Sequence, residues 1–302
     1  MAKDRIGFIG LGAMGAPMAR QIVASGAAVT VYDVSAESVA ALVEAGARAA
    51  ATPREAAEQS DIVICMLPHP DVVRGVLLGP DGVVHADPAP QLAIDMSTSG
   101  PEVVRECAAA LAESGIGMLD APVGKGPWAA EKGELTILLG GPDELCAKAE
   151  PVLRVVGSTV LRCGPLGAGQ AVKLANNLVA CANMAAVTEG YALAKRAGAD
   201  PAVLLEMMPG TSADSWQLRH TMIGKIMQGD LSPMFKLQLA HKDMRLVLEL
   251  ASGSDLDVGC AKATYEWYDA AMRHGYGDHD WGAIALVADP DLAPQPPVGD
   301  VR

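Results

Sequence analysis

Short apolar runs recur along the first half of the chain, and each has a length suited to one buried strand. Stretches of helical composition separate most of these runs, as at residues 16–25, which end at Gly26. Strands that alternate with helices form a mostly parallel sheet with helices on both faces. We therefore predict an α/β fold with a doubly wound parallel sheet. The predicted strands are residues 5–9, 27–33, 61–68, 91–98, 117–123, 134–141 and 159–164.

Two tetrapeptides mark predicted helix starts within this half. Thr52–Glu55 and Ser99–Glu102 each place a hydroxyl residue three positions before a glutamate. This is the capping-box pattern, in which the two side chains satisfy the free N–H groups of a helix start. We predict a helix after each tetrapeptide, and the second should end near Ser114.

The pattern changes at Pro165, after which no further strand is predicted. Residues 164–198 contain no other proline and predict one long helix. At 1.5 Å per residue, roughly 30 residues span about 45 Å, which is enough to link two domains. Helical spacing returns at residues 234–251, 261–272 and 281–289. We therefore predict that the second half of the chain is an all-α domain.

A glycine-rich turn joins the first predicted strand to the first helix. It reads Gly10-Leu11-Gly12-Ala13-Met14-Gly15. Gly10 permits a tight turn, Gly12 lets the backbone approach a pyrophosphate, and Gly15 lets the helix and strand pack closely. The amino terminus of the helix offers N–H donors and partial positive charge to phosphates. The turn therefore predicts a Rossmann-type dinucleotide-binding domain.

Asp33 ends the second predicted strand and indicates which dinucleotide binds. Its carboxylate would accept hydrogen bonds from the adenosine ribose hydroxyls and repel a 2′-phosphate. No lysine or arginine follows Asp33 before Arg48. The sequence therefore favours NAD over NADP as the cofactor. The alternative is that the glycines only shape a loop and that Asp33 caps the next helix.

Further strand ends should lie beside the cofactor, because ligands bind outside the carboxyl ends of parallel strands. Such ends are occupied by Met66-Leu67-Pro68, by Thr98 and by the loop Gly124-Lys125-Gly126. We predict a Rossmann domain at residues 1–164 and a helical substrate and dimerisation domain at 165–290. The long helix should join the two domains, and a proline-rich tail should follow at 291–302.

Composition and charge exclude several functions. The 302 residues are 50% hydrophobic, which is ample for two cores. The net charge of −13, without a stripe of lysine and arginine, argues against nucleic acid or an anionic membrane as partner. No apolar run approaches the ~20 residues that span a bilayer. Six scattered cysteines without a C-x-x-C pair predict a reduced, cytoplasmic protein without a zinc site.

One other cluster has residue types that bind metals. His274, Asp278, His279 and Asp280 lie close in sequence, but glycines interrupt them and their spacing is irregular. We interpret the cluster as a surface turn and predict no metal site.

Lys173 and Asn177 are four residues apart, so they share one face of the long predicted helix. A lysine and an amide on an otherwise apolar helix face are typical of a polar site. A surface lysine with an asparagine neighbour would give the same pattern, so the helix alone does not decide between these readings.

Together, these motifs resemble the β-hydroxyacid dehydrogenase family, the group of 3-hydroxyisobutyrate dehydrogenase and tartronate semialdehyde reductase. The resemblance covers residues 5 to about 290. It rests on FIGLGAMGAPMA at the cofactor turn, MLP at 66–68, DMST at 95–98, DAPV at 120–123, GAGQAVKLANN at 167–177 and HKD at 241–243. It implies an NAD-dependent oxidoreductase that transfers hydride between the nicotinamide and a small β-hydroxy acid or its semialdehyde.

The resemblance also implies roles for single residues. Lys173 would be the catalytic acid–base, and Asn177 would help to hold the substrate. Lys242 would contact the substrate or the cofactor, and Thr98 would lie near the nicotinamide and the substrate. Family members are dimers or tetramers, so the resemblance implies a homodimer or homotetramer.

The chain departs from the family directly after DAPV. Most members continue with Ser-Gly-Gly, which holds a carboxylate, whereas this chain has Gly124-Lys125-Gly126. Members that act on sulfolactaldehyde are similar, with Gly-Arg-Thr at this place. A sulfonate has three acceptor oxygens and one charge, so a cation beside backbone N–H donors suits it. We predict that Lys125 anchors a small anionic substrate, although a solvated loop lysine is the alternative.

The substrate expected first is therefore sulfolactaldehyde or dihydroxypropanesulfonate. Two alternatives keep the same reaction class, with 3-hydroxyisobutyrate or tartronate semialdehyde as the substrate. A remote alternative is a non-catalytic scaffold that only binds the cofactor, as in chromatin-associated relatives. Those relatives lose the lysine and add DNA- or histone-binding segments, whereas this acidic chain keeps Lys173.

Overall fold

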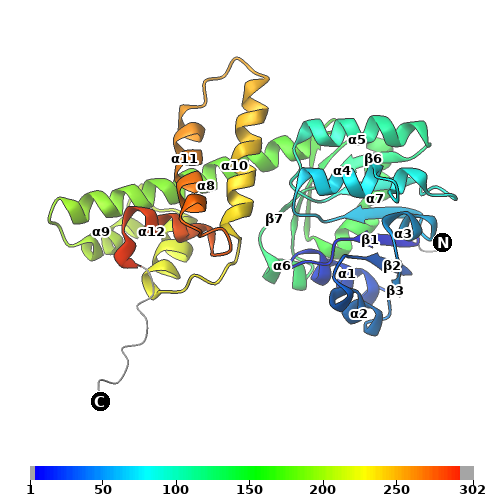
Figure 1. Cartoon of the computed structure of the whole chain (residues 1–302), viewed down its shortest axis with the longest axis horizontal. Coiled ribbons are helices and arrows are strands. Elements are labelled where there is room, and N and C mark those ends of the chain that lie inside the picture. The colour runs from blue at the N-terminus through cyan, green and yellow to red at the C-terminus, as the bar shows by residue number, and fades with distance from the viewer. Residues whose placement is uncertain (1–3, 293–302) are drawn as a thin grey trace. The chain divides into compact units, whose positions relative to one another are not determined.

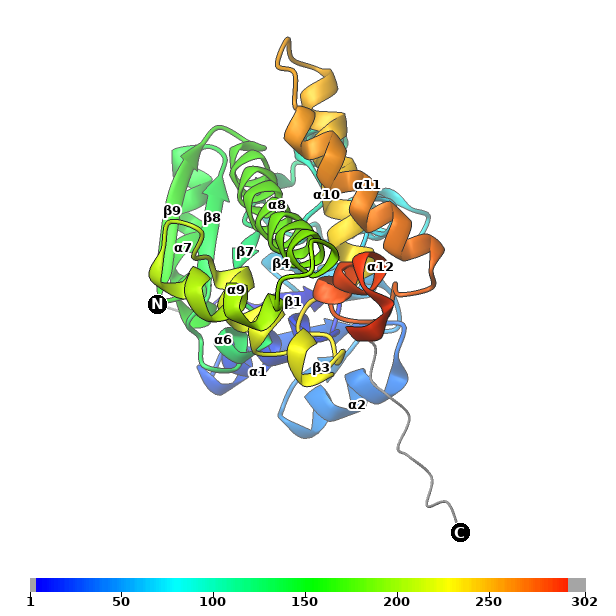
Figure 2. The same cartoon turned by 90° about the vertical axis from the view of Figure 1, so that its left-hand side faces the viewer.

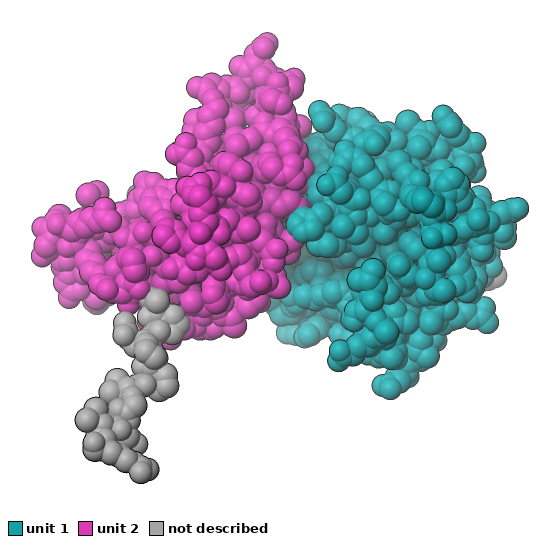
Figure 3. Space-filling model, viewed as in Figure 1, with its two compact units in different colours: residues 1–174 teal, residues 175–302 magenta. Residues whose placement is uncertain are grey.

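The computed structural model describes residues 4–292. The chain divides into two compact units, unit 1 (Met1–Leu174) and unit 2 (Ala175–Arg302) (Figure 3). The predicted domain boundary at residue 164 precedes this division, because hydrogen bonds to Asp120 hold the start of the long helix in unit 1. From residue 293 onward, the predicted proline-rich tail lies outside the described residues.

A mostly parallel sheet forms the centre of unit 1 (Figure 1). Its strands are β1 (Ile6–Ile9), β2 (Val29–Tyr32), β3 (Arg48–Ala49), β4 (Ile62–Cys65), β5 (Leu92–Asp95), β6 (Gly117–Asp120), β7 (Val123–Gly124), β8 (Thr136–Gly140) and β9 (Thr159–Gly164). They follow the order β3-β2-β1-β4-β5-β6-β8-β7, and β9 pairs with β8. Only the pairs that β8 makes with β6 and β7 are antiparallel among the described strands. The predicted doubly wound α/β sheet is confirmed.

Helices cover both faces of this sheet, because successive strand residues point to opposite sides. Phe8 and Ile64 lie in the core on one face, and their neighbours Ile9 and Val63 lie in the core on the other. The first face carries α1 (Gly15–Ala24), α2 (Ala36–Glu44), α6 (Pro127–Glu131) and α7 (Asp143–Val156), and the second carries α3 (Pro53–Glu58), α4 (Pro70–Leu78) and α5 (Pro101–Glu113). Figure 1 shows α4 and α5 across the strands from α1 and α2.

The two predicted capping boxes have different outcomes. Thr52 Oγ1 accepts a hydrogen bond from Glu55 N at 3.0 Å, and α3 follows as predicted. The box predicted at Ser99–Glu102 is wrong, because the N-cap of α5 is Gly100, with a φ of 88°. Ser99 Oγ instead donates to Asp95 at 2.5 Å, since a buried carboxylate requires donors.

Unit 2 is helical, as predicted. α8 (Ala168–Arg196) starts in unit 1 and continues into unit 2, so the long helix predicted at 164–198 is confirmed. α10 (Leu237–Ser252) and α11 (Gly259–Arg273) lie side by side as an antiparallel pair (Figure 2). The other helices of unit 2 are α9 (Pro201–Met207), α12 (Ala285–Ala288) and the π-helix η3 (Gln217–Ile223). Short 3₁₀ segments lie at Met208–Gly210, Ile226–Gln228, Trp281–Ile284 and Pro290–Leu292. Unit 1 has a 3₁₀ segment at Val83–His85. Within residues 4–292, no helix is both long and apolar enough to cross a bilayer.

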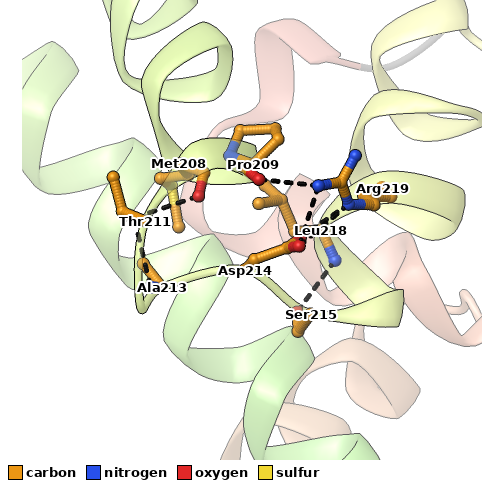
Figure 4. A network of polar contacts seen from close by, with 8 residues as sticks. All are labelled: Met208, Pro209, Thr211, Ala213, Asp214, Ser215, Leu218 and Arg219. Atoms are coloured by element: carbon orange, nitrogen blue, oxygen red, sulfur yellow. Dashed lines mark hydrogen bonds and ion pairs between the residues drawn. The ribbon is translucent and has the colours of Figure 1, made fainter.

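A polar network fixes the turn between α9 and η3 (Figure 4). Arg219 Nε donates to Asp214 Oδ1 at 2.8 Å, while Arg219 Nη2 donates to Asp214 Oδ2 at 2.8 Å and to Pro209 O at 2.6 Å. Ser215 Oγ accepts a hydrogen bond from Leu218 N at 3.1 Å where η3 begins. The sequence predicted no element between residues 198 and 234, because side-chain contacts rather than a regular apolar period hold this segment.

Candidate active site

The loops that follow the parallel strands of unit 1 meet at one edge of the sheet, here called the carboxyl edge. Backbone hydrogen bonds join neighbouring strand ends there, from Met66 N to Ile9 O at 2.9 Å and from Met96 N to Cys65 O at 2.8 Å. Five predicted site segments occupy this edge or continue past it. They are Gly10–Gly15, Asp33, Met66–Pro68, Thr98 and Gly124–Gly126.

The glycine loop differs in what each of its three glycines is needed for. Gly10 has a φ of 97°, and a Cβ there would lie 2.3 Å from Met66 O. A Cβ on Gly15 would lie 1.9 Å from Gly10 O, so the packing of the loop itself requires these two glycines. A Cβ on Gly12 would meet no atom of residues 4–292 within 4 Å. Packing against these residues therefore does not demand glycine at position 12, whereas a pyrophosphate lying on the loop would demand it.

Asp33 lies directly beside this loop. Its carboxylate accepts hydrogen bonds from Leu11 N at 2.5 Å and from Ser35 N at 2.8 Å. The alternative that Asp33 caps α2 is wrong, because the N-cap is Ser35, whose Oγ accepts from Ser38 N at 3.2 Å. Each carboxylate oxygen of Asp33 keeps acceptor capacity for ribose hydroxyls. The start of α1 has neither a side-chain cap nor an acidic residue, so these residues fit a dinucleotide.

Asp33→Ala should weaken NADH binding about 10- to 100-fold, because a hydrogen bond to a charged group contributes ~1.5–3 kcal/mol. The same change should reduce the discrimination against NADPH, since the charge that repels a 2′-phosphate is lost. Fluorescence titration of both cofactors measures the two dissociation constants. Asp33→Asn is the matched control, because it keeps the size and one acceptor but removes the charge. An unchanged ratio of the two constants in both variants would contradict the role of Asp33.

Two buried aspartates end neighbouring strands at the carboxyl edge. Asp95 and Asp120 are paired in register and are 1% and 0% exposed. Asp120 accepts hydrogen bonds from Gly167 N at 2.7 Å and Gln170 N at 2.8 Å. Burial raises the pKa of Asp120, and the two backbone hydrogen bonds oppose that rise because they favour the carboxylate. A carboxylate from β6 therefore caps the amino terminus of α8.

The Gln170 side chain connects α8 to the loop that carries Thr98. Gln170 Oε1 accepts from Ser99 N at 3.0 Å and from Gly100 N at 3.1 Å, and Nε2 donates to Ser97 O at 2.9 Å. Gln170 is fully buried. Lys173 follows one helical turn later in unit 1 and is partly exposed. The sequence did not predict roles for Asp120 or Gln170, although a polar residue that ends a buried run was the available signal.

Asn177 and Lys242 lie in unit 2, on either side of Asp243. Asn177 Nδ2 donates to Asp243 Oδ2 at 2.6 Å, and Lys242 Nζ forms an ion pair with Asp243 Oδ1 at 2.9 Å. All three residues are buried. Because a buried ammonium group requires a counter-charge, Asp243 explains how Lys242 can be buried. The sequence alone predicts no role for Asp243.

The loop after β7 holds Lys125 in an unusual conformation. Its φ is 70°, and among the described residues it is the only one other than glycine with a positive φ. The side chain is exposed, and its ammonium group donates to Glu134 O at 2.6 Å. An ammonium group has three N–H donors, so this contact leaves two for other acceptors.

Among residues 4–292, no group of three or more His, Cys, Asp or Glu side chains gathers in a way that could hold a metal ion. Two members of the cluster at 274–280 have structural contacts instead. Asp278 pairs with Lys236 at 2.8 Å, and the buried Asp280 accepts from Met234 N at 2.9 Å and from Gly282 N at 3.1 Å.

Two protein-family models together match most of the chain. The NAD binding domain of 6-phosphogluconate dehydrogenase matches residues 5–164. The model described as NAD-binding of NADP-dependent 3-hydroxyisobutyrate dehydrogenase matches residues 167–288. The two matches meet at the start of α8, where Asp120 and Gln170 form their contacts.

Individual relatives are similar over nearly the whole chain. The 3-sulfolactaldehyde reductase of Escherichia coli (strain K12) is 38% identical over 279 residues, which are 92% of this chain and 94% of the relative. The 2-(hydroxymethyl)glutarate dehydrogenase of Eubacterium barkeri is 36% identical over 283 residues, 94% of each chain. A solved 3-hydroxyisobutyrate dehydrogenase from Salmonella typhimurium is 31% identical, has a TM-score of 0.83, and is matched over 94% of this chain and 99% of its own.

Proposed function

Because the chain belongs to the β-hydroxyacid dehydrogenase family of NAD-dependent oxidoreductases, we propose that it interconverts a small anionic semialdehyde and its β-hydroxy acid. The substrate proposed first is sulfolactaldehyde, with dihydroxypropanesulfonate as its reduced form. The observation that carries the anionic substrate is Lys125, which stands between two glycines in a conformation that a lysine side chain disfavours. Residues in such conformations cluster at active sites and ligand-binding loops.

Lys173 is the proposed acid–base. When bound, the nicotinamide supplies or accepts the hydride. Lys173 Nζ gives a proton to the carbonyl oxygen during reduction and takes one from the hydroxyl during oxidation. Asn177, one turn later on α8, is proposed to hold the substrate, and Lys242 to contact substrate or cofactor. For a lysine to exchange protons near neutral pH, its pKa must fall from about 10.4, so the pH–rate profile should show an ionisation between about 6 and 9.

The other predicted site segments of unit 1 are proposed to orient the reacting groups and to exclude water from them. Gly10–Gly15 and Asp33 would hold the dinucleotide, and Met66–Pro68 would line it. Thr98 would lie beside the nicotinamide and the substrate. What supports this assignment is that all these segments occupy the carboxyl edge, where ligands of doubly wound sheets bind.

Lys125→Gly and Lys125→Ala form a matched pair that separates charge from backbone strain. Both should raise the KM for an anionic substrate about tenfold, because one charge-assisted contact of ~1.4 kcal/mol is lost, with the Kd for NADH unchanged. Lys125→Gly should also gain up to about 1 kcal/mol of stability, since glycine adopts a positive φ without strain. Steady-state kinetics and thermal unfolding measure the two effects. An unchanged KM in both variants would make Lys125 a structural loop residue.

Two other readings have testable consequences. If the loop holds a carboxylate, 3-hydroxyisobutyrate or tartronate semialdehyde would be preferred over the sulfonate. If the protein is a non-catalytic scaffold, it would bind NADH without consuming it.

We also propose a homodimer or homotetramer, and light scattering of the purified chain measures this directly.

The proposed function is tested by following NADH consumption with a panel of three-carbon aldehydes. The panel contains a sulfonate, a carboxylate and a neutral aldehyde of similar size, each assayed with NADH and with NADPH. We expect turnover with NADH and with the anionic aldehydes. Equal kcat/KM for the neutral aldehyde would contradict recognition of the anion, and turnover of none of them would favour the scaffold.

A further inference from the structure

The start of α8 is fixed by groups that belong to the sheet. Asp120 accepts hydrogen bonds from the N–H groups of Gly167 and Gln170, at 2.7 and 2.8 Å. Glycine is required on both sides of this carboxylate, because a Cβ on Gly140 would lie 2.4 Å from Asp120 Oδ1 and a Cβ on Gly169 would lie 2.2 Å from Leu138 O. The first turn of the helix therefore packs directly against the sheet, and the two hydrogen bonds to Asp120 hold it there.

The Gln170 side chain forms hydrogen bonds with three backbone groups, two N–H donors and one carbonyl acceptor. Its oxygen accepts from two N–H groups, those of Ser99 and Gly100, and its nitrogen donates to the carbonyl of Ser97. A side-chain amide supplies the acceptor and the donor that this geometry requires. The loop 97–100 contains Thr98. Gln170 therefore connects the loop that carries Thr98 to the helix that carries Lys173.

Gln170 and Lys173 are three residues apart and therefore lie on nearly the same face of α8. A small movement of the Gln170 turn would move Lys173 relative to Thr98 by a comparable amount. A displacement of about 1 Å at a reacting group can slow a reaction on the order of 100-fold.

We propose that Gln170, with Asp120 as its anchor, is a positioning residue that sets where Lys173 lies relative to the Thr98 loop. This proposal rests on the acid–base role of Lys173 proposed above. Gln170 itself contacts neither substrate nor cofactor in this account. Its effect on the reaction passes through the hydrogen bonds to Ser97, Ser99 and Gly100.

Gln170→Met tests the proposal, because methionine fills the same volume and forms none of the three hydrogen bonds. The measurement is the single-turnover rate constant of NADH oxidation, with Kd for NADH measured alongside. When NADH is bound beforehand at one equivalent and the aldehyde is saturating, this rate constant does not depend on the fraction of folded protein, which changes only the amplitude of the first turnover. We expect the rate constant to fall about 100-fold and Kd for NADH to stay within about threefold of wild type.

Gln170→Glu gives a graded comparison, since it keeps the acceptor for Ser99 and Gly100 but places an oxygen against the carbonyl of Ser97. Its rate constant should lie between those of Gln170→Met and wild type, and it decides the test if Gln170→Met does not fold. Ser60→Ala is the matched control. Ser60 is a buried polar residue at the opposite edge of the sheet whose Oγ donates to Ala56 O at 2.7 Å. Its loss should leave the rate constant unchanged.

A rate constant for Gln170→Met within about threefold of wild type would overturn the proposal. A loss of amplitude alone, with the rate constant preserved, would overturn it too, because that result shows a purely structural role. Lys173→Met, assayed in parallel, distinguishes a failure of the positioning role of Gln170 from a failure of the acid–base role of Lys173. If Lys173→Met reacts at the wild-type rate, the proposed acid–base role itself fails, whatever Gln170 does.

Discussion

Lys173→Met is expected to lower kcat by about 10³-fold while the Kd for NADH stays within about threefold of wild type. Methionine keeps an unbranched side chain on α8 but has no proton to give. During reduction, the carbonyl oxygen would then develop negative charge without a donor, and during oxidation the hydroxyl proton would have no acceptor. Steady-state kinetics and a binding titration with NADH measure the two quantities.

Lys195→Met is the matched control for this variant, because it makes the same substitution on the same helix. Lys195 Nζ pairs with Asp289 at 2.6 Å, and its side chain is 40% exposed. We expect kcat within about twofold of wild type, since Lys195 lies near the far end of α8 from Lys173 and its ammonium group pairs with Asp289 and Asp291. A Lys173→Met enzyme that keeps more than about a tenth of the wild-type kcat would contradict general acid–base catalysis by Lys173.

Gly12→Val is expected to weaken NADH binding by at least about 100-fold, or ~2.7 kcal/mol, without lowering the stability of the fold by more than about 0.5 kcal/mol. Among the described residues, the Cβ at this position would meet no protein atom within 4 Å, so the fold leaves room where the side chain begins. The pyrophosphate proposed to lie on the loop would meet the added methyl groups directly. Titration with NADH and thermal unfolding of the same samples measure both effects.

Gly15→Ala provides the contrast, because its Cβ would lie 1.9 Å from Gly10 O. That contact forces the backbone to move, so we expect a loss of stability of ~1–3 kcal/mol together with weaker NADH binding. If Gly12→Val bound NADH like wild type, the pyrophosphate would not lie on this loop. If Gly12→Val instead unfolded as readily as Gly15→Ala, the loop would be structural only.

The sheet of unit 1 was predictable because its strands are apolar on both faces and their ends carry recognisable residues. The glycine loop was predictable for a related reason, since Gly10 and Gly15 meet backbone atoms that leave no room for a side chain. The long helix followed from the lack of proline after Pro165. In each case, a local physical requirement leaves a mark within a short stretch of sequence.

The polar network around Asp120 and Gln170 could not be predicted in the same way. Asp120 is 47 and 50 positions away from its partners Gly167 and Gln170 in the sequence. Gln170 is 71 and 70 positions away from Ser99 and Gly100, so only the folded chain brings these residues together. The capping box at Ser99 failed for a different reason, because the buried carboxylate of Asp95, four residues earlier, accepts the hydrogen bond of its hydroxyl. The turn at 208–219 depends on the pair of Arg219 and Asp214, for which a hydrophobic period gives no signal.

Lys125 shows the limit of the site prediction. The sequence indicated a cation in a loop at the carboxyl edge, and the structure adds its positive φ and its contact with Glu134 O. That contact occupies one ammonium N–H, so the anion would have to bind through the remaining two or displace Glu134 O. Lysine is a point charge rather than a planar fork, so its discrimination between a sulfonate and a carboxylate depends on the neighbouring backbone donors.

The most direct measurement compares sulfolactaldehyde and tartronate semialdehyde side by side, as kcat/KM for NADH oxidation by the wild-type protein. We expect at least a tenfold preference for the sulfonate, which corresponds to about 1.4 kcal/mol in transition-state binding. That result would make Lys125 a specificity residue for a sulfonated substrate. A tenfold preference for the carboxylate, or equal values for both, would contradict the proposed substrate and assign the Gly124–Gly126 loop to carboxylate binding.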